Sequence, residues 1–419
     1  MSDDDFASKS MWEYLADGMI KNWPSLQDKS KNTVFQFTGQ PVPAIWTSGL
    51  DYGAWTLANI VPANLDGYYI QSTNLVARAY KDFISSIAPS NFQRNAQYQQ
   101  YQVELSNLAD LYKTTVADAE NSYNQFVERY PNISEGMGYF TWLSKGGTAG
   151  PSYSLKFSNI ESQQAVVTSE IGEFMKSVDF SLSEAQLAVN DLTNLQKFSF
   201  GGVSQEGLVT SLDELTSYRA KWANRPAGSA PDLNVTINKD TVQKGSWHKV
   251  VHTSVKRKCL SISTHTDIDT SRVLLDTKFS INIQAVGANT FRINRGSWFD
   301  ASWLSASNVR FPEGSRFTMN DFFGENGSLH LVPTRALVIY KPKVTITIST
   351  ETYTQTVQKS FDASASISLF GANFSLAAGV KNIVKDGPEN TKVITLDSYS
   401  GVEASPLLFG MSSQSFYKE

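Results

Sequence analysis

The chain of 419 residues is poor in cysteine, in charge and in histidine. Its single cysteine, Cys259, excludes an internal disulfide framework and any structural zinc site built on cysteines. Charged residues make up 18 % of the chain, below the roughly 25 % of an average protein. A net charge of -4 argues against a nucleic-acid-binding protein that depends on bulk charge. Its 24 Phe, 17 Tyr and 9 Trp residues suffice for a large core, so the chain is not disordered.

The sequence also lacks a recognisable targeting segment and a spanning helix. Residues 1–5 are acidic, whereas a secretory signal starts with basic residues followed by an apolar stretch. The uncharged stretch 32–50 contains Pro41 and Pro43 and therefore does not form a transmembrane helix. We expect a protein that is synthesised in the cytoplasm without a signal peptide and would need lysis or an unconventional route to leave the cell.

The hydrophobic pattern changes along the chain. Residues 1–70 are rich in Trp and Pro and are expected to form an arm packed on the body, because exposed Trp side chains are costly. Residues 71–224 show helical spacing, and residues 232–419 show the alternation of strands. The Pro- and Gly-containing segment 225–231 is the predicted linker. The sequence therefore predicts an α+β chain, with an N-terminal long-helix bundle followed by a C-terminal antiparallel β-sheet or sandwich domain.

The strongest periodic signal covers residues 92–130, where apolar residues recur every three or four positions. It predicts one helix of about 58 Å, at about 1.5 Å per residue, that includes Tyr101–Phe126 and ends before Pro131. Four further helices are expected in this half, over residues 75–87, about 162–175, 182–198 and 208–223, and a Gly-rich connector is expected over residues 136–150.

In the second half, turn-forming residues separate the expected strands. Gly287-Ala288-Asn289 predicts a turn between strands at 278–285 and 291–294. A long Ser/Thr-rich strand is expected over residues 344–356, followed by strand pattern over 361–380 and 392–396.

No catalytic or metal-binding motif stands out. The Gly-rich run 145–150 lacks the Gly-Lys-Ser/Thr ending of a phosphate-binding loop. Ser246 and Lys249 match a Ser-x-x-Lys pattern without the partner motifs of that enzyme class. The pair His248 and His252, and the alternating run His265, Asp267 and Asp269, are better explained as solvated polar faces than as metal sites. We expect no metal and no cofactor. An enzyme with a site assembled from scattered residues is the least favoured hypothesis.

A local cluster of basic residues is more informative. Between residues 244 and 258 the chain contains five Lys or Arg residues and no carboxylate. Such a concentration in an acidic protein is suited to phosphates, lipid headgroups or an acidic partner, although a solvated strand face would have the same composition. The candidate headgroup-binding residues are Lys244, Lys249, Lys256, Arg257 and Lys258.

The segment 361–380 carries the functional hypothesis. From Val344 to Leu376, 12 of 33 residues are Ser or Thr. Apolar residues occupy odd positions before Phe370-Gly371 and even positions after it, which predicts a hairpin with two nine-residue arms. A strand that crosses a bilayer needs about 9–11 residues. The candidate membrane-insertion residues are Phe361, Ala363, Ala365, Ile367, Leu369, Phe374 and Leu376.

Three classes of function therefore remain: a pore-forming or membrane-perturbing protein, a structural self-assembling protein and, least favoured, an enzyme with a site assembled from scattered residues. The chain resembles, in architecture and not in any motif, pore-forming toxins that combine helices with a β-module. This resemblance implies a non-enzymatic, membrane-interacting protein that assembles as a homo-oligomer on a lipid membrane and binds no nucleic acid. The alternative is a structural, self-assembling cytosolic protein whose long helices mediate oligomerisation; an ordinary β-sandwich hairpin would explain the same alternation.

Overall fold

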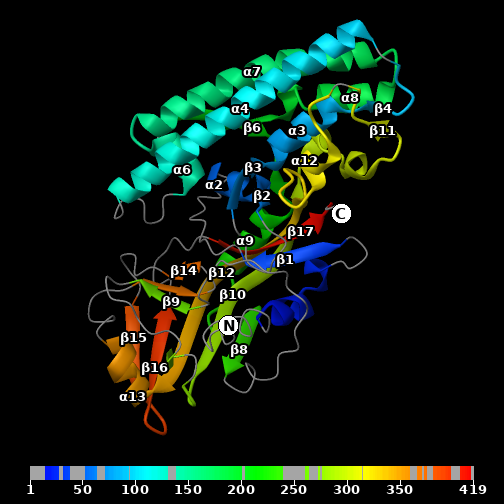
Figure 1. Ribbon diagram of the computed structural model, residues 1–419. Helices are drawn as coiled ribbons and strands as arrows, with labels where there is room; N and C mark the ends of the chain where they lie inside the picture. The colour runs from blue at the N-terminus through cyan, green and yellow to red at the C-terminus, as the bar shows by residue number, and fades with distance from the viewer. Residues whose placement is uncertain are drawn as a thin grey trace.

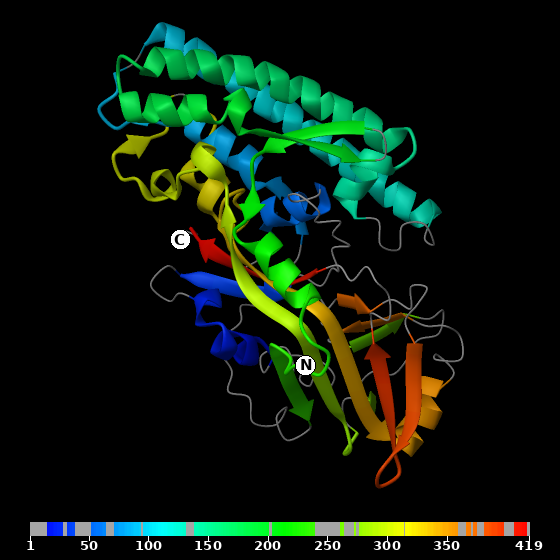
Figure 2. The ribbon, with the colours of Figure 1, turned by 180° about the vertical axis from the view of Figure 1, so that it is seen from behind.

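The computed structural model confirms the α+β class, with helices mainly in the first half and antiparallel strands in the second. The long helices lie at one end of the molecule and the main sheet at the other (Figures 1 and 2). The structure describes residues 15–27, 32–37, 52–63, 71–93, 95–130, 138–200, 203–238, 260–263, 272–273, 276–313, 315–358, 366–369, 372–374, 381–397 and 406–416.

The main sheet is eight-stranded and antiparallel, and two long strands form its centre. These are β10 (Ser280–Asn294) and β12 (Leu331–Ser349), which pair over most of their length. One path of the sheet is β1-β17-β12-β10-β7, and off it β8 pairs with β10 while β16 pairs with β12 and β15. The other strands are β1 (Thr33–Phe37), β7 (Ser211–Leu212), β8 (Leu233–Asn238), β15 (Lys381–Gly387), β16 (Thr391–Asp397) and β17 (Leu407–Ser415).

Strand β12 separates two apolar cores. Leu337 and Ile339 belong to the larger core, together with Leu15 of the N-terminal segment. The alternate residues Val338 and Tyr340 belong to a second core on the opposite face. Because successive residues of a strand point to opposite faces, an uninterrupted apolar run is buried on both sides here.

Two sequence predictions in this half are wrong. The expected turn at Gly287-Ala288-Asn289 lies inside β10, so the strands at 278–285 and 291–294 are one strand. Gly287 is needed there because a Cβ atom would come within 2.3 Å of Trp222. The strand expected over 344–356 ends at Ser349, whose side chain accepts a hydrogen bond from Thr352 N and caps the helical turn that follows.

The helical half contains the predicted long helix. Helix α4 (Ala96–Arg129) includes all of Tyr101–Phe126 and starts later than the predicted residue 92, because Asn95 caps it by accepting from Tyr98 N. It packs antiparallel against α7 (Ala149–Met175), where Tyr112 contacts Phe157 and Tyr98 contacts Phe174. Smaller helices adjoin this pair: α3 (Val76–Ser86), α6 (Tyr139–Lys145), α8 (Phe180–Ala188) and α12 (Met319–Phe323).

Some boundaries in this half differ from the predictions. The expected Gly-rich connector 136–150 contains α6, whose Trp142 is fully buried. The helix expected over 182–198 ends at Ala188, and residues 195–208 form the hairpin β5 (Leu195–Phe200) and β6 (Val203–Leu208). The last expected helix, 208–223, starts only at Leu215, as α9 (Leu215–Ala223).

Candidate functional site

Part of the predicted hairpin is present. Strands β13 (Ser366–Leu369) and β14 (Ala372–Phe374) are antiparallel, with Leu369 opposite Ala372 and Ile367 opposite Phe374. This register fits the two-residue turn predicted at Phe370-Gly371. The other candidate insertion residues, Phe361, Ala363, Ala365 and Leu376, lie outside the described residues.

The hairpin pairs with a strand from a distant part of the chain. β13 is antiparallel to β9 (Leu260–Ser263), with Ile367 opposite Ile262 and Ser368 opposite Ser261. The resulting three-stranded sheet has the order β14-β13-β9 (Figure 1). Two connections of the main sheet therefore meet in this small sheet: residues 239–279, between β8 and β10, and residues 350–380, between β12 and β15.

Both connections leave the main sheet at the same end. Asn238 pairs with Ser280, and Ser280 also pairs with Thr347, two residues before the end of β12. Ser349 pairs with Thr391, the first residue of β16. The order β8-β10-β12-β16 thus consists of antiparallel neighbours; residues 239–279 join β8 to β10, whereas the chain after β12 passes first into β15, which pairs with β16 on its other edge.

The predicted basic cluster cannot be placed beside this sheet. Lys244, Lys249, Lys256, Arg257 and Lys258 all lie outside the described residues, as do the four candidate metal ligands of segments 248–252 and 265–267 and also Asp269. Among the residues that the structure describes, no group of three His, Cys, Asp or Glu side chains could hold a metal ion.

The structure reveals a cleft that the sequence did not predict. It has a volume of about 960 Å³ and lies between α3, α4 and the segment 316–328. Arg316 forms an ion pair with Asp110 of α4, and both side chains are largely exposed. Arg78 and Asp82 of α3 also line the cleft.

Arg78 is the most buried charged group of the cleft. Its Nε donates to Oδ2 of Asp82 at 2.9 Å, and its guanidinium lies 3.8 Å from the centre of the Tyr112 ring. Its Nη1 is 3.8 Å from Oε1 of Glu161, a half-exposed residue of α7. Burial lowers the pKa of the neighbouring Lys81 to about 8, although Glu161 opposes this effect. Arg78 of α3 thus contacts both α4, through Tyr112, and α7, through Glu161.

Several charged side chains of the cleft are already paired within the protein. Three of the carboxylates that line the cleft already have partners: Asp82 with Arg78, Asp110 with Arg316, and Asp321 with the backbone N–H of Thr318 at the start of α12. The lining residues include neither His nor Cys. The i,i+4 spacing of Arg78 and Asp82 is the one sequence signal that could have indicated a charged pair here.

Comparisons with known proteins give no relative for this chain: no family model, no curated protein and no solved structure matches it. None of the helices in the described part of the chain combines the length and apolar composition that a membrane crossing requires.

Proposed function

We propose that the protein is a non-enzymatic, membrane-perturbing protein in which the segment around the β13–β14 hairpin inserts into a lipid bilayer. The observation that carries this proposal is the position of the hairpin. It lies in the connection between β12 and β15, which flank β16 in the main sheet. Its register pairs Ile367 with Phe374, as the alternation of apolar residues requires.

The topology supports insertion as a β-structure. Every backbone polar group of a membrane-spanning segment needs a hydrogen-bond partner within the protein, so only helices and closed β-assemblies span a bilayer. If β15 separated from β16 and residues 350–390 became extended, they would lengthen β12 and β16 as a hairpin and keep the antiparallel pairing of these two strands. Residues 239–279 would lengthen β8 and β10 in the same way. Several copies would be needed to close such a sheet, which agrees with the expected homo-oligomer.

A reversible lock tests the hairpin. Ser261 and Ser368 are directly opposite in β9 and β13. Cross-strand Cα distances of about 4.5–5.5 Å fall within the range of a disulfide, about 4.4–6.8 Å. In a Cys259→Ser background, the pair Ser261→Cys and Ser368→Cys should release dye from liposomes when reduced and stop doing so when oxidised, with unchanged circular dichroism.

A matched control uses the same chemistry in the helical half. Ser199 and Ser204 are opposite in β5 and β6, and a disulfide between cysteines at these positions should leave dye release unchanged. If the oxidised β9–β13 lock still permeabilises vesicles at the wild-type rate, the hairpin is not the inserting element. If the wild-type protein releases no dye from neutral or anionic vesicles, the membrane function itself is wrong.

The predicted basic cluster would supply the first contact with anionic headgroups. Replacing Lys256, Arg257 and Lys258 by Gln should weaken binding to anionic liposomes and flatten its dependence on salt. The control is a triple Lys→Gln variant at three helical lysines, which changes the net charge equally: Lys113, Lys156 and Lys176. Equal loss of binding in both variants would indicate a general charge effect.

A self-assembling structural protein is the second candidate function. It is favoured by apolar side chains on the outer surface of the helices, where Leu155 is 64 % and Val166 60 % exposed on α7. Contiguous exposed apolar surface often marks a protein interface. Leu155→Glu with Val166→Glu should lower the mass found by sedimentation, whereas Leu192→Glu, on another exposed leucine, should not.

A further inference from the structure

Helix α3 has two faces of different chemistry. On its apolar face, Phe83 packs against Phe322 of α12, with 5.3 Å between the ring centroids. This face belongs to a core cluster shared with the start of β12. The other face carries Arg78, Asp82 and Ser85, which recur at helical spacing and are turned toward α4 and α7.

The contacts of this second face are polar from end to end. Arg78 stacks on Tyr112 of α4 and lies 3.8 Å from Glu161 of α7. Seven residues further along α3, Gln102 of α4 donates its Nε2–H to the carbonyl oxygen of Ser85 at 3.0 Å. Helix α4 is antiparallel both to α3 and to α7, so α7 runs parallel to α3.

This geometry brings buried polar residues of α7 into the same layer. Gln164 and Thr168 follow Glu161 by three and seven residues, and both are 0 % exposed. Gln186 of α8 joins them, because its Nε2 donates to the carbonyl oxygen of Ile84 at 3.0 Å. We refer to this layer as the polar seam; it consists of Arg78, Asp82, Ser85, Gln102, Glu161, Gln164, Thr168 and Gln186.

Several buried polar atoms of the seam lack hydrogen-bond partners. Within the described part of the chain, both amide atoms of Gln164, Oγ1 of Thr168 and Oγ of Ser85 have no hydrogen-bond partner. A buried polar atom without a partner has lost its hydration without compensation. A layer of such groups is therefore a weak boundary between the units on its two sides.

One of these units is formed by α4, α6 and α7. Leu105 of α4 and Val167 of α7 share an apolar cluster, and Trp142 of α6 shares a second cluster with Phe157. Both clusters lie mainly between these three helices, so the helices should move together. We refer to α4, α6 and α7 as the helical lobe.

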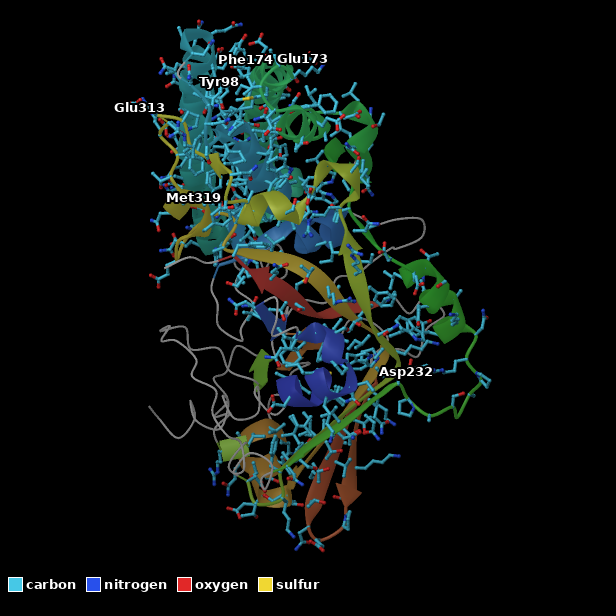
Figure 3. All side chains as sticks on the ribbon, turned by 90° about the vertical axis from the view of Figure 1, so that its right-hand side faces the viewer. Tyr98, Glu173, Phe174, Asp232, Glu313 and Met319 are labelled. Atoms are coloured by element: carbon cyan, nitrogen blue, oxygen red, sulfur yellow. The ribbon has the colours of Figure 1, made fainter. Side chains whose placement is uncertain are left out.

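Both chain connections between the lobe and the rest of the protein lie at one end, and Phe140 of α6 packs against the apolar cluster of Trp55 and Phe198. Residues 87–95 lead from α3 into α4, and residues 176–179 lead from α7 into α8. These connections lie close together, because Phe92 and Tyr98 both contact Phe174 at the end of α7. Figure 3 shows Tyr98, Glu173 and Phe174 grouped at this end. Toward the other end, exposed Arg316 and Asp110 form the ion pair across the cleft.

We infer that the helical lobe rotates as a rigid body away from α3 and α8 about residues 87–93 and 176–179, opening along the polar seam. The ion pair between Arg316 and Asp110 holds α4 against the segment 316–328 in the closed position, and we refer to it as the clasp. Two rigid apolar units joined by a polar contact and two adjacent connections are the arrangement from which hinge motions arise. This inference concerns the helical half and does not depend on the proposed membrane function.

The test measures access to the seam in the folded protein. In a Cys259→Ser background, Thr168→Cys places a thiol in the seam and Ser413→Cys places one in β17, at a position that is also 0 % exposed. We expect a disulfide reagent such as dithionitrobenzoate to label the thiol at 168 at least ten times faster than the thiol at 413. Its rate should depend less on urea than global unfolding does, because a hinge exposes less surface.

Two further variants test whether the labelling rate at position 168 depends on movement of the helical lobe. Asp110→Asn removes the clasp and should speed labelling at 168 several-fold, whereas Gln164→Met makes the seam more apolar and should slow it. Ser106→Cys, on α4 and 3 % exposed, gives a second probe if Thr168→Cys does not fold. The inference is wrong if the seam probe and the control probe react at the same rate with the same urea dependence.

Discussion

On the central strand β12, buried positions carry Leu337, Ile339 and Ile346, whereas equally buried positions of α7 carry Gln164 and Thr168. An apolar layer gains free energy with every atom removed from water. A polar layer loses its hydration and regains it only through hydrogen bonds. The main sheet and the polar seam therefore have opposite roles: the sheet stabilises the fold, and the seam permits movement of the helical lobe.

The largest effect should come from the main sheet. Leu337→Ala removes a fully buried side chain from the centre of β12, and we expect the free energy of unfolding to fall by about 2–5 kcal/mol. Urea denaturation followed by circular dichroism measures this loss. The exposed Leu192 is the control, because Leu192→Ala should change stability by less than about 0.5 kcal/mol. Similar losses at both positions would contradict the assignment of the core.

A smaller effect is expected where α9 packs on the sheet. Gly287→Ala would place a Cβ atom 2.3 Å from the ring of Trp222, which stacks on Tyr340 of β12. Displacing this ring should cost about 1–3 kcal/mol and shift the tryptophan emission. Gly18→Ala is the matched control: its nearest contact would be 3.7 Å, and alanine favours the helix over residues 15–22. Equal stability of the two variants would show that Trp222 moves without cost.

Removing polar atoms from the seam should preserve or raise the free energy of unfolding, whereas the two substitutions in the sheet lower it. Gln164→Met preserves length and removes two polar atoms without partners, so we expect stability to stay equal or to rise by about 1 kcal/mol. Thermal and urea unfolding measure it. A loss as large as that of Leu337→Ala would mean that Gln164 is a satisfied, stabilising core residue, and would remove the contrast between the two regions.

This contrast also explains what the sequence could predict. The long helix and the β13–β14 turn were predictable because their apolar residues repeat at one period over many positions or reverse parity at one point. The continuity of β10 through Gly287 was not, because it depends on Trp222, 65 residues earlier in the sequence. A local turn signal carries no information about a distant ring.

The cleft and the seam were unpredictable for a related reason. Arg316 and Asp110 are 206 residues apart, and their pairing follows only from the packing of the segment 316–328 against α4. In the sequence, Gln164 and Thr168 resemble the ordinary polar residues of an exposed helix. Their burial becomes visible only when α3, α7 and α8 are brought together.

The smallest effect concerns the pH dependence of the charged end of the seam. Lys81 of α3 is partly buried, and burial lowers its pKa from the ordinary 10.5 to about 8, while Arg78 adds to this effect and Glu161 and Asp82 oppose it. Between pH 8 and pH 10.5 the unfolded chain therefore binds more protons at this lysine than the folded protein, so stability rises with pH.

We expect a gain of up to about 1 kcal/mol from pH 8 to pH 9 in wild-type protein and none in Lys81→Met. Lys113→Met, at an exposed lysine of α4, should retain the gain. Urea unfolding between pH 7.5 and 9 measures it, at least one unit below the ordinary tyrosine pKa of about 10. Parallel curves for the two variants would show that Lys81 keeps its charge without penalty, and that this end of the seam is hydrated in the closed state.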